Sequence, residues 1–284
     1  MSNTREVQAM QLPIQKLRPF ENHPFQVKDD DEMNQLVWSV LTQGVLTPLV
    51  VRPLENDEYE VISGHRRLHA CQKAGIEMVP ALIYALDRDA AAVALVDSNL
   101  HREKILPSEK AFAYKLKMDA LSHQGASRQL GEKWSVSQLS EAGTDSERQI
   151  HRYIRLTELI PQILSMVDTG RIALTPAVEL SYLQPSEQEM IFSVMDSDEV
   201  TPSLSQARRL RRMSEEQTLT DDAVLQLLSE VKGNQVEYVK VPVDKLRSFF
   251  RPDTSVKQMT ETLVKAMDFY NKHLARQRKD RDAR

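Results

Sequence analysis

The sequence predicts an α+β protein in three parts: a mixed α/β domain, an all-helical domain with a helix–turn–helix, and a small α/β region at the C-terminal end. Short β-branched segments alternate with helical patterns up to about residue 100, and the pattern is almost entirely helical from Pro107 to about residue 213. Aromatic residues make up only 6% of the 284 residues and only eight residues are glycine, which favours helices over sheet sandwiches. We therefore place the three parts at residues 1–104, 105–215 and 216–284.

The composition indicates a cytoplasmic protein without a membrane-spanning segment. The apolar run at residues 90–96 is far too short to cross a bilayer, and the N-terminus lacks the charged-then-apolar pattern of a signal peptide. The single cysteine, Cys71, excludes an internal disulfide framework and a cysteine-based zinc site. A net charge of −4 gives no bulk signal for nucleic acid, so a DNA site must depend on a local basic patch.

The first part begins with an extended segment at residues 12–20, because Pro13 and Pro19 exclude a helix there. Acidic residues at 29–32 suit the positive end of a helix, and Gly44 supplies its stop. Three strands are expected at residues 49–51, 59–62 and 78–84, with helices at residues 65–74 and 89–99.

The second part opens with a helix at Pro107, and the polar, glycine-punctuated residues 122–134 predict a loop or a weakly formed segment. A pair of helices follows over residues 135–157, with the turn at Gly143 and Thr144 or Asp145 as the cap of the second helix. Polar, acidic residues at 213–220 predict a linker.

The second helix of this pair carries a basic face. Ile150 and Ile154 lie four residues apart and are expected to face the core, so the polar residues between them point outward, as a recognition helix requires. Three arginines against Glu147 give this helix a net charge of +2. On these residues alone, an ordinary amphipathic helix with a solvated basic face remains the alternative. The expected DNA-binding residues are Ser146, Arg148, Gln149, Arg152 and Arg155.

A second group of polar residues, 63–67 (Ser-Gly-His-Arg-Arg), lies between a strand and a helix. Gly64 lets the backbone approach a ligand, and the start of the helix presents free N–H groups. Arg66 and Arg67 have the forked geometry that binds phosphate oxygens. A glycine loop at residues 44–48 is placed to cover the other side of a phosphate chain, although two surface turns with solvated arginines would give the same pattern.

A third group, residues 97–103, is a polar helix end joined to the capped helix at Pro107, and it is typical of a hinge between domains. In order and spacing, the three groups closely resemble the ParB partition family over about residues 10–180. The matching segments are residues 22–26, 44–48, 51–53, 59–70 and 97–109.

This resemblance implies an N-terminal domain of the fold that ParB proteins share with sulfiredoxin, and a nucleoid-associated homodimer that binds double-stranded DNA through its helix–turn–helix. It also implies a CTP site that closes the dimer into a sliding clamp, and a ParA-type ATPase that is stimulated by a basic residue such as Arg5. Such a protein would segregate a chromosome, a plasmid or an integrative element. By position, Gly44 and Thr47 would line the nucleotide pocket, Gly64, Arg66 and Arg67 would hold the triphosphate, and Asn99 and Arg102 would complete it.

Two departures from the family pattern bear on activity. His65 and Ser98 each stand where the family usually has glutamate, and the second glutamate is thought to serve Mg²⁺. Mg²⁺ favours carboxylate and phosphate oxygens, and the neighbouring Asp97 points about 100° away on a helix. We therefore expect CTP binding with weak or absent hydrolysis, so that the protein is at most a weak CTPase with no assigned catalytic residue.

Two other functional classes remain open. A ParB-like transcriptional regulator or nucleoid-occlusion factor would use the same DNA-binding domain without a partition ATPase. A sulfiredoxin-type enzyme needs a cysteine beside the His-Arg pair, but Ser63 stands there, and Cys71 lies a helical turn or more further on, where a buried apolar role is expected.

The C-terminal region predicts a strand at residues 236–241 and an amphipathic helix at about residues 255–273. Dimerisation is the expected role of this helix, given its place in the chain. The tail at residues 272–284 carries six Lys or Arg residues against two aspartates, a net charge of +4. This tail either binds the DNA backbone or is a solvated end.

Overall fold

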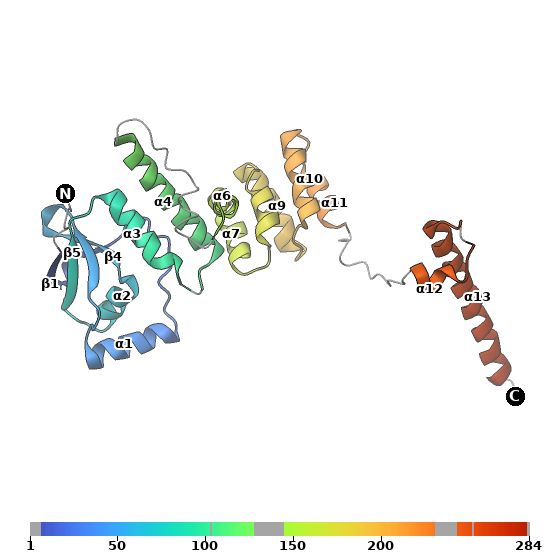
Figure 1. Cartoon of the computed structure of the whole chain (residues 1–284), viewed down its shortest axis with the longest axis horizontal. Coiled ribbons are helices and arrows are strands. Elements are labelled where there is room, and N and C mark those ends of the chain that lie inside the picture. Colours follow the sequence, from blue (N-terminus) through green and yellow to red (C-terminus); the bar gives the residue numbers. More distant parts are fainter. Residues whose placement is uncertain (1–6, 103, 128–144, 231–242, 252, 283–284) are drawn as a thin grey trace. The chain divides into compact units, whose positions relative to one another are not determined.

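The computed structural model describes residues 7–102, 104–127, 145–230, 243–251 and 253–282. The chain forms two compact units, residues 1–230 and 231–284, and each is described by itself. The first unit contains a sheet and a succession of helices (Figure 1).

The sheet has five strands in the order β1-β5-β3-β4-β2. Antiparallel pairs join β1 to β5 and β3 to β4, whereas β3 pairs with β5, and β2 with β4, in parallel. The three expected strands are confirmed, and the extended N-terminal segment forms two more. The bounds of the strands are β1 Val7–Pro13, β2 Leu17–Pro19, β3 Leu49–Pro53, β4 Tyr59–Ser63 and β5 Met78–Tyr84. Two short 3-10 helices lie between strands, η1 at Ile14–Lys16 and η2 at Glu55–Asp57.

Each face of the sheet covers its own core, because neighbouring side chains of a strand point to opposite faces. Val61 of β4 faces a core with α1 (Asp31–Gln43) and α2 (His65–Lys73). The next residue, Ile62, faces a core with α3 (Arg88–Leu100) and α4 (Pro107–Ser127). As predicted, α1 begins at an acidic cap, since Asp30 accepts the N–H of Met33 (2.9 Å), and it ends at Gly44 with φ 74°.

Helix α4 runs further than expected. The polar composition of residues 122–134 predicted a loop, but α4 continues to Ser127. The physical reason is tertiary packing: Ala113 and Ala120 are buried against α3, while Tyr114 and Leu121 are buried against the following helix. These contacts along two sides of α4 stabilise the helix, although the polar residues at its C-terminal end have low helix propensity. The first helix of the predicted helix–turn–helix falls in residues 128–144, outside the described part of the chain.

The remaining helices of the first unit share one core, in which Leu156, Ile163, Leu180, Ile191 and Leu210 are fully buried. Their bounds are α6 Glu147–Arg155, η3 Leu156–Glu158, α7 Pro161–Asp168, α8 Leu174–Leu180, α9 Pro185–Ser197, α10 Leu204–Glu215 and α11 Asp221–Leu228.

The expected linker at residues 213–220 is a short connection within this core. Helix α10 occupies it as far as Glu215, and Val224 and Leu227 of α11 are buried in the same core, so the compact unit extends to Glu230. The division at residue 104 stays a prediction.

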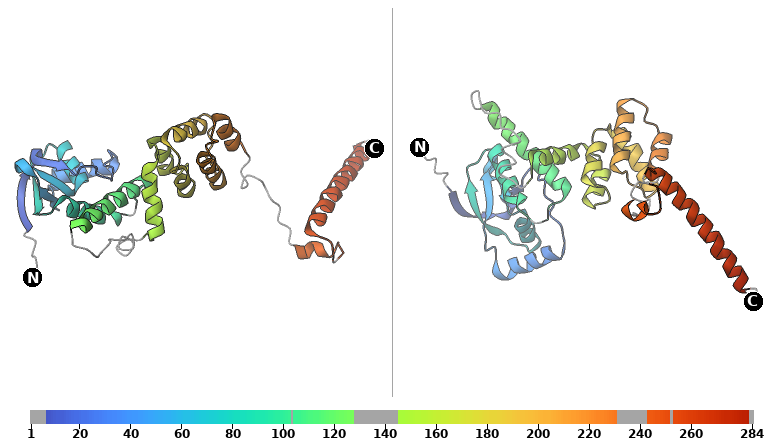
Figure 2. Two further views of the ribbon diagram at one scale, coloured as in Figure 1. Left: turned by 90° about the horizontal axis from the view of Figure 1, so that it is seen from above. Right: turned by 45° about the vertical axis from the view of Figure 1, so that its right-hand side comes forward.

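In the second unit, α12 (Val243–Arg247) precedes one long helix, α13 (Val256–Asp282), which is shown in Figure 2. The expected helix is therefore confirmed and extends through most of the basic tail. The predicted strand at residues 236–241 lies outside the described residues. None of the helices in the described part of the chain is long and apolar enough to cross a membrane.

Candidate nucleic-acid interface and phosphate-binding loop

Helix α6 presents one buried face and one polar face. Ile150 is fully buried and packs with Tyr114 and Leu121 of α4, as its spacing predicted. The cap differs from expectation: Ser146, and neither Thr144 nor Asp145, is the N-cap, and its Oγ accepts the N–H of Gln149 (3.4 Å).

Asp145 has another role than the expected cap. Its carboxylate accepts hydrogen bonds from Lys110 Nζ (2.9 Å) and from the hydroxyl of Tyr114 (2.7 Å), both on α4. Burial, and then this hydrogen bond, raise the pKa of Tyr114 above its usual value. Asp145 therefore anchors the start of α6 to α4, and the Ser146 hydroxyl accepts a hydrogen bond from one of the free N–H groups of the first turn.

The predicted DNA-binding residues of α6 differ in their surroundings. Arg148 is exposed, and it makes no side-chain hydrogen bond or ion pair with any other described residue. Gln149 and Arg152 are half-buried and bonded to each other (3.1 Å), and Arg152 also donates to Thr175 Oγ1 at the start of α8.

Arg155 is half-buried and directed towards helix α8, and its contact with DNA stays a prediction. Its guanidinium donates to Ser181 Oγ (3.2 Å) and to the carbonyl of Ser181, and it lies over the ring of Tyr182 (4.2 Å to the centroid). Helix α8 packs against this side of α6, and spacing within α6 alone carries no sign of that neighbour.

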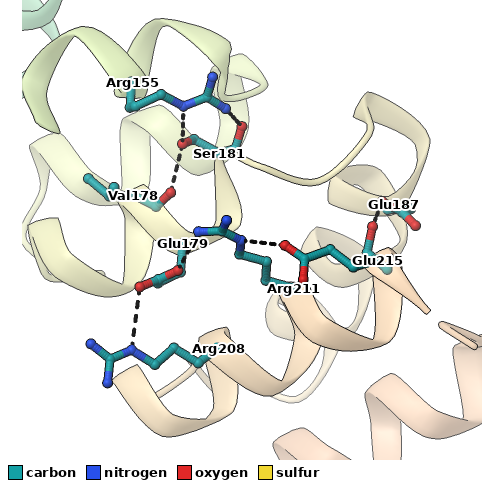
Figure 3. A network of polar contacts seen from close by, with 9 residues as sticks. Arg155, Val178, Glu179, Ser181, Glu187, Arg208, Arg211 and Glu215 are labelled. Atoms are coloured by element: carbon teal, nitrogen blue, oxygen red, sulfur yellow. Dashed lines mark hydrogen bonds and ion pairs between the residues drawn. The ribbon is translucent and has the colours of Figure 1, made fainter. Parts of the chain in front are cut away.

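A second arginine reaches the same tyrosine from α10. Arg211 lies 3.8 Å from the centroid of the Tyr182 ring and pairs with Glu179 (3.1 Å) and Glu215 (2.9 Å), as Figure 3 shows for the two carboxylates. Arg208 pairs with Glu179 as well (3.4 Å).

A surface hollow of about 380 Å³ lies along α6 and α8. Its lining includes Arg148, His151, Arg152, Arg155, Val178 and Tyr182. Sequence reasoning missed His151, Val178 and Tyr182. The last two belong to a distant stretch of the chain that only the packing of α8 brings beside α6.

The predicted phosphate-binding loop is built at the junction of β4 and α2. Gly64 is the N-cap of α2 with φ 105°, and a Cβ there would collide with Leu49 Cδ2. Arg67 donates to the carbonyls of Thr47 and Pro48 (2.7 Å for Pro48), so the two predicted loops are in direct contact. Burial lowers the pKa of the Arg67 guanidinium from its usual value.

Arg66 and Arg102 lie at the edge of this loop. Arg66 is partly exposed and pairs with Glu32 (3.2 Å) and Asp30 (3.7 Å) of α1. Arg102 lies over the ring of Phe25 (5.5 Å); burial lowers its pKa, and the positive charge of Arg66 acts in the same direction. The carboxylate of Glu109 acts in the opposite direction on the pKa of Arg102, and Arg66 is paired with two carboxylates, so both guanidinium groups already have negative neighbours at this edge.

Asn99 is buried and donates to Leu95 O (2.7 Å) and Ser98 Oγ (3.2 Å). The Ser98 hydroxyl itself donates to the same carbonyl (2.9 Å). Asp97 pairs with Lys117 of α4, whose side chain is only 6% exposed. The one carboxylate near the expected Mg²⁺ position is therefore already engaged, and no cluster of three potential metal ligands occurs among the described residues.

His65 is largely buried, and its ring faces His23 and Phe20. Its ring lies 3.7 Å from that of His23, and its Nε2 accepts the N–H of Phe20 (3.4 Å). Burial lowers the pKa of His65 to about 3, and the neighbouring His23 acts in the same direction. The imidazole is therefore neutral at physiological pH and contributes no positive charge to the loop.

Known proteins resemble this chain over its N-terminal domain and beyond it. Residues 1–100 match the ParB N-terminal domain. The nucleoid occlusion protein of Listeria innocua is 31% identical over 185 residues, which are 64% of this chain and 60% of that protein. The nucleoid occlusion protein of Bacillus thuringiensis (strain Al Hakam) is 29% identical over 227 residues, 76% of this chain and 74% of that protein.

Among solved structures, truncated ParB from Caulobacter crescentus in complex with the centromeric parS site covers 73% of this chain and 99% of its own, with 19% identity and a TM-score of 0.41. The same protein with CTP-γ-S gives 20% identity and a TM-score of 0.32, and covers 72% of this chain and 98% of its own. Residues 1–100 thus match the ParB N-terminal domain, and the relatives that extend beyond it are nucleoid occlusion proteins.

Proposed function

We propose that this chain is a sequence-specific partition protein that loads as a homodimer on a centromere-like site in double-stranded DNA. One observation carries the proposal: α6 is held by its buried Ile150 face while Arg148, Gln149 and Arg152 lie together on its accessible side. Arginine and glutamine make the paired hydrogen bonds that distinguish guanine and adenine in the major groove. A helix of this kind, preceded by another helix and a turn, is the reading element of a helix–turn–helix.

The N-terminal domain is proposed to bind CTP. Support comes from the match of residues 1–100 to the ParB N-terminal domain, and from the α2 start, where free N–H groups and Gly64 lie beside the Thr47 loop that Arg67 contacts. The residues fit a triphosphate better than they fit Mg²⁺, because Ser98 is no carboxylate and Asp97 is paired with Lys117. The proposed nucleotide response is therefore binding with little hydrolysis.

Dimerisation is proposed to use the second unit. Apolar side chains of α13 are exposed within that unit, and a second copy would cover them. They are Val256, Val264, Met267, Phe269 and Tyr270. The proposed ParA-type ATPase would be contacted by the N-terminal segment around Arg5, which precedes the described residues.

A second candidate function is a nucleoid-occlusion factor that binds DNA without a partition ATPase. The names of the two relatives from Listeria and Bacillus favour it. A ParA-type gene beside this one, and stimulation of its ATPase by the purified chain, would select partition. Absence of stimulation by wild-type protein that binds its DNA site would select the second candidate.

The test is selection of duplexes from a randomised pool with the full-length chain. We expect one recurrent motif, and we expect the Arg152→Ala variant to lose it while the Arg209→Ala control keeps it. Arg209 is an exposed arginine of α10 that pairs with Glu230 (2.6 Å), away from α6. Failure to enrich any motif would overturn DNA recognition, and an unchanged motif in Arg152→Ala would overturn the assignment to α6.

A further inference from the structure

Helix α8 holds two arginines of α6 from the side. Arg152 donates to Thr175 Oγ1 at the start of α8, and Arg155 donates to the hydroxyl (3.2 Å) and the carbonyl of Ser181 at its end. The Ser181 hydroxyl donates in turn to Val178 O (2.7 Å), so it is fixed in the orientation that accepts from Arg155 (Figure 3).

The end of α8 is fixed in turn by α10. Arg155 and Arg211 both lie over the ring of Tyr182, at 4.2 and 3.8 Å from its centroid, and Arg211 is also paired with Glu179 of α8. These contacts form a continuous link from α6 through α8 to α10. An arginine that stacks on a ring and donates two hydrogen bonds to one residue has its planar group committed to that place.

Arg155 thus differs from Arg148, although both are arginines of the same short helix. Arg148 is exposed and, among the described residues, unpaired, whereas Arg155 is half-buried and its donors point to Ser181. A base contact requires the guanidinium to reach beyond the protein surface. Arg148 meets this condition, and Arg152 has one partner outside α6, Thr175, to release. Arg155 would have to leave both Ser181 and the Tyr182 ring.

We propose that Arg155 is a positioning residue that sets the angle of α6 through Ser181 and Tyr182, while Arg148 and Arg152 make the contacts with double-stranded DNA. The inference rests on the proposed function, since it assumes that α6 enters the major groove. A small rotation of α6 would break paired base contacts, because these depend on a closely fixed geometry.

The first experiment measures the affinity of the full-length chain for a duplex recovered by selection, at several salt concentrations, by fluorescence anisotropy. Arg155→Ala is expected to weaken binding about tenfold, the loss that goes with one charge-assisted hydrogen bond, with an unchanged salt slope. Arg155→Lys is expected to bind as weakly as Arg155→Ala, because lysine keeps the charge but lacks the planar fork. Arg209→Ala removes an exposed arginine of α10 that pairs with Glu230, and it is expected to bind like wild type.

A double-mutant cycle supplies the specific readout. The effects of Arg155→Ala and Tyr182→Ala on DNA affinity are expected to be non-additive, whereas those of Arg155→Ala and Arg209→Ala, the control pair, are expected to add, because Arg209 pairs with Glu230 and contacts neither residue. Additive effects in the first pair would overturn the proposal. So would a salt slope reduced by about 0.9 in Arg155→Ala and restored by Arg155→Lys, because that is the result of a direct phosphate contact.

A third measurement separates this inference from the proposed function. In protein without DNA, Arg155→Ala and Arg155→Lys are expected to raise the hydrogen exchange of the α6 amide groups, while Arg148→Ala leaves it unchanged. Unchanged exchange in the Arg155 variants would overturn the positioning role whether or not the chain binds DNA. Failure of wild-type protein to enrich any duplex would overturn the proposed function, and with it the role of Arg155 in DNA recognition.

Discussion

Replacement of Gly64 by alanine tests the architecture of the predicted phosphate-binding loop. Gly64 has φ 105°, and a Cβ at this position would overlap Leu49 Cδ2 and lie 3.3 Å from Arg67 Cζ. Leu49 is fully buried, so its side chain has no free space into which it can move. Two costs therefore add in Gly64→Ala: backbone strain at positive φ and overpacking of the core.

The matched control is Gly75→Ala. Gly75 also has positive φ, 68°, but nothing lies within 4 Å of its Cβ position. Strain alone is expected to cost about 1–2 kcal/mol in the control. Overpacking adds about 1–3 kcal/mol at Gly64, so the free energy of unfolding should fall by about 2–5 kcal/mol there.

The assay is urea denaturation followed by circular dichroism, with hydrogen exchange of peptides from β4, α2 and β5 to locate the loss. The difference between the two variants isolates the packing cost from the strain. If Gly64→Ala is no less stable than Gly75→Ala, the collision with Leu49 is relieved at no cost, and the reasoning about this loop is wrong.

Three further predictions follow from individual groups. The pKa of His65 is about 3 in the folded chain and near 6.5 in an unfolded one, so the unfolded state binds more protons between these pH values. The free energy of unfolding should therefore fall as the pH drops from about 6.5 towards 3, by up to about 1.4 kcal/mol per pH unit. Urea denaturation at several pH values should show this fall, and a less steep one in His65→Gln. Ile150→Ala should lower the free energy of unfolding by about 2–5 kcal/mol, whereas the half-buried Ile154→Ala should cost clearly less; equal losses in chemical denaturation would contradict the assigned buried face. Purified protein should bind labelled CTP, and the Arg66→Ala variant should bind it more weakly. Mg²⁺-dependent hydrolysis of CTP should stay near background in a phosphate-release assay. Hydrolysis well above background would refute the expectation drawn from Ser98 and Asp97.

The sequence predicted the elements whose signals are local. Helix α1 has acidic residues and a cap at its start, an apolar repeat and a terminal glycine, and it forms within two residues of the expected bounds. The strand β5 was likewise apparent from its β-branched and apolar run. The start of β1 was missed because this strand lies at the sheet edge with five exposed residues in a row, and an edge strand is held by backbone pairing that leaves no alternating apolar pattern.

The site was only partly predictable for the same reason. The loop at residues 44–48 was expected on the other side of a phosphate chain from Arg67, whereas in the structure Arg67 donates directly to the carbonyls of Thr47 and Pro48. The contacts of Arg155 could not be predicted from the sequence, because its partners Ser181 and Tyr182 lie at the end of a helix far along the chain. His65 shows the same limit: its residue type was informative, but its direction depended on His23 and Phe20.

The neighbours Asp145 and Ser146 have a consequence for how this protein tolerates variation. Asp145 is restricted by two partners on another helix, Lys110 and Tyr114, whereas Ser146 is restricted by the backbone N–H that follows it. In a saturation library, position 146 should accept aspartate, asparagine and threonine, which all cap helices. Position 145 should accept almost no other residue unless Lys110 and Tyr114 are substituted as well. The two adjacent positions would therefore tolerate different substitutions during evolution.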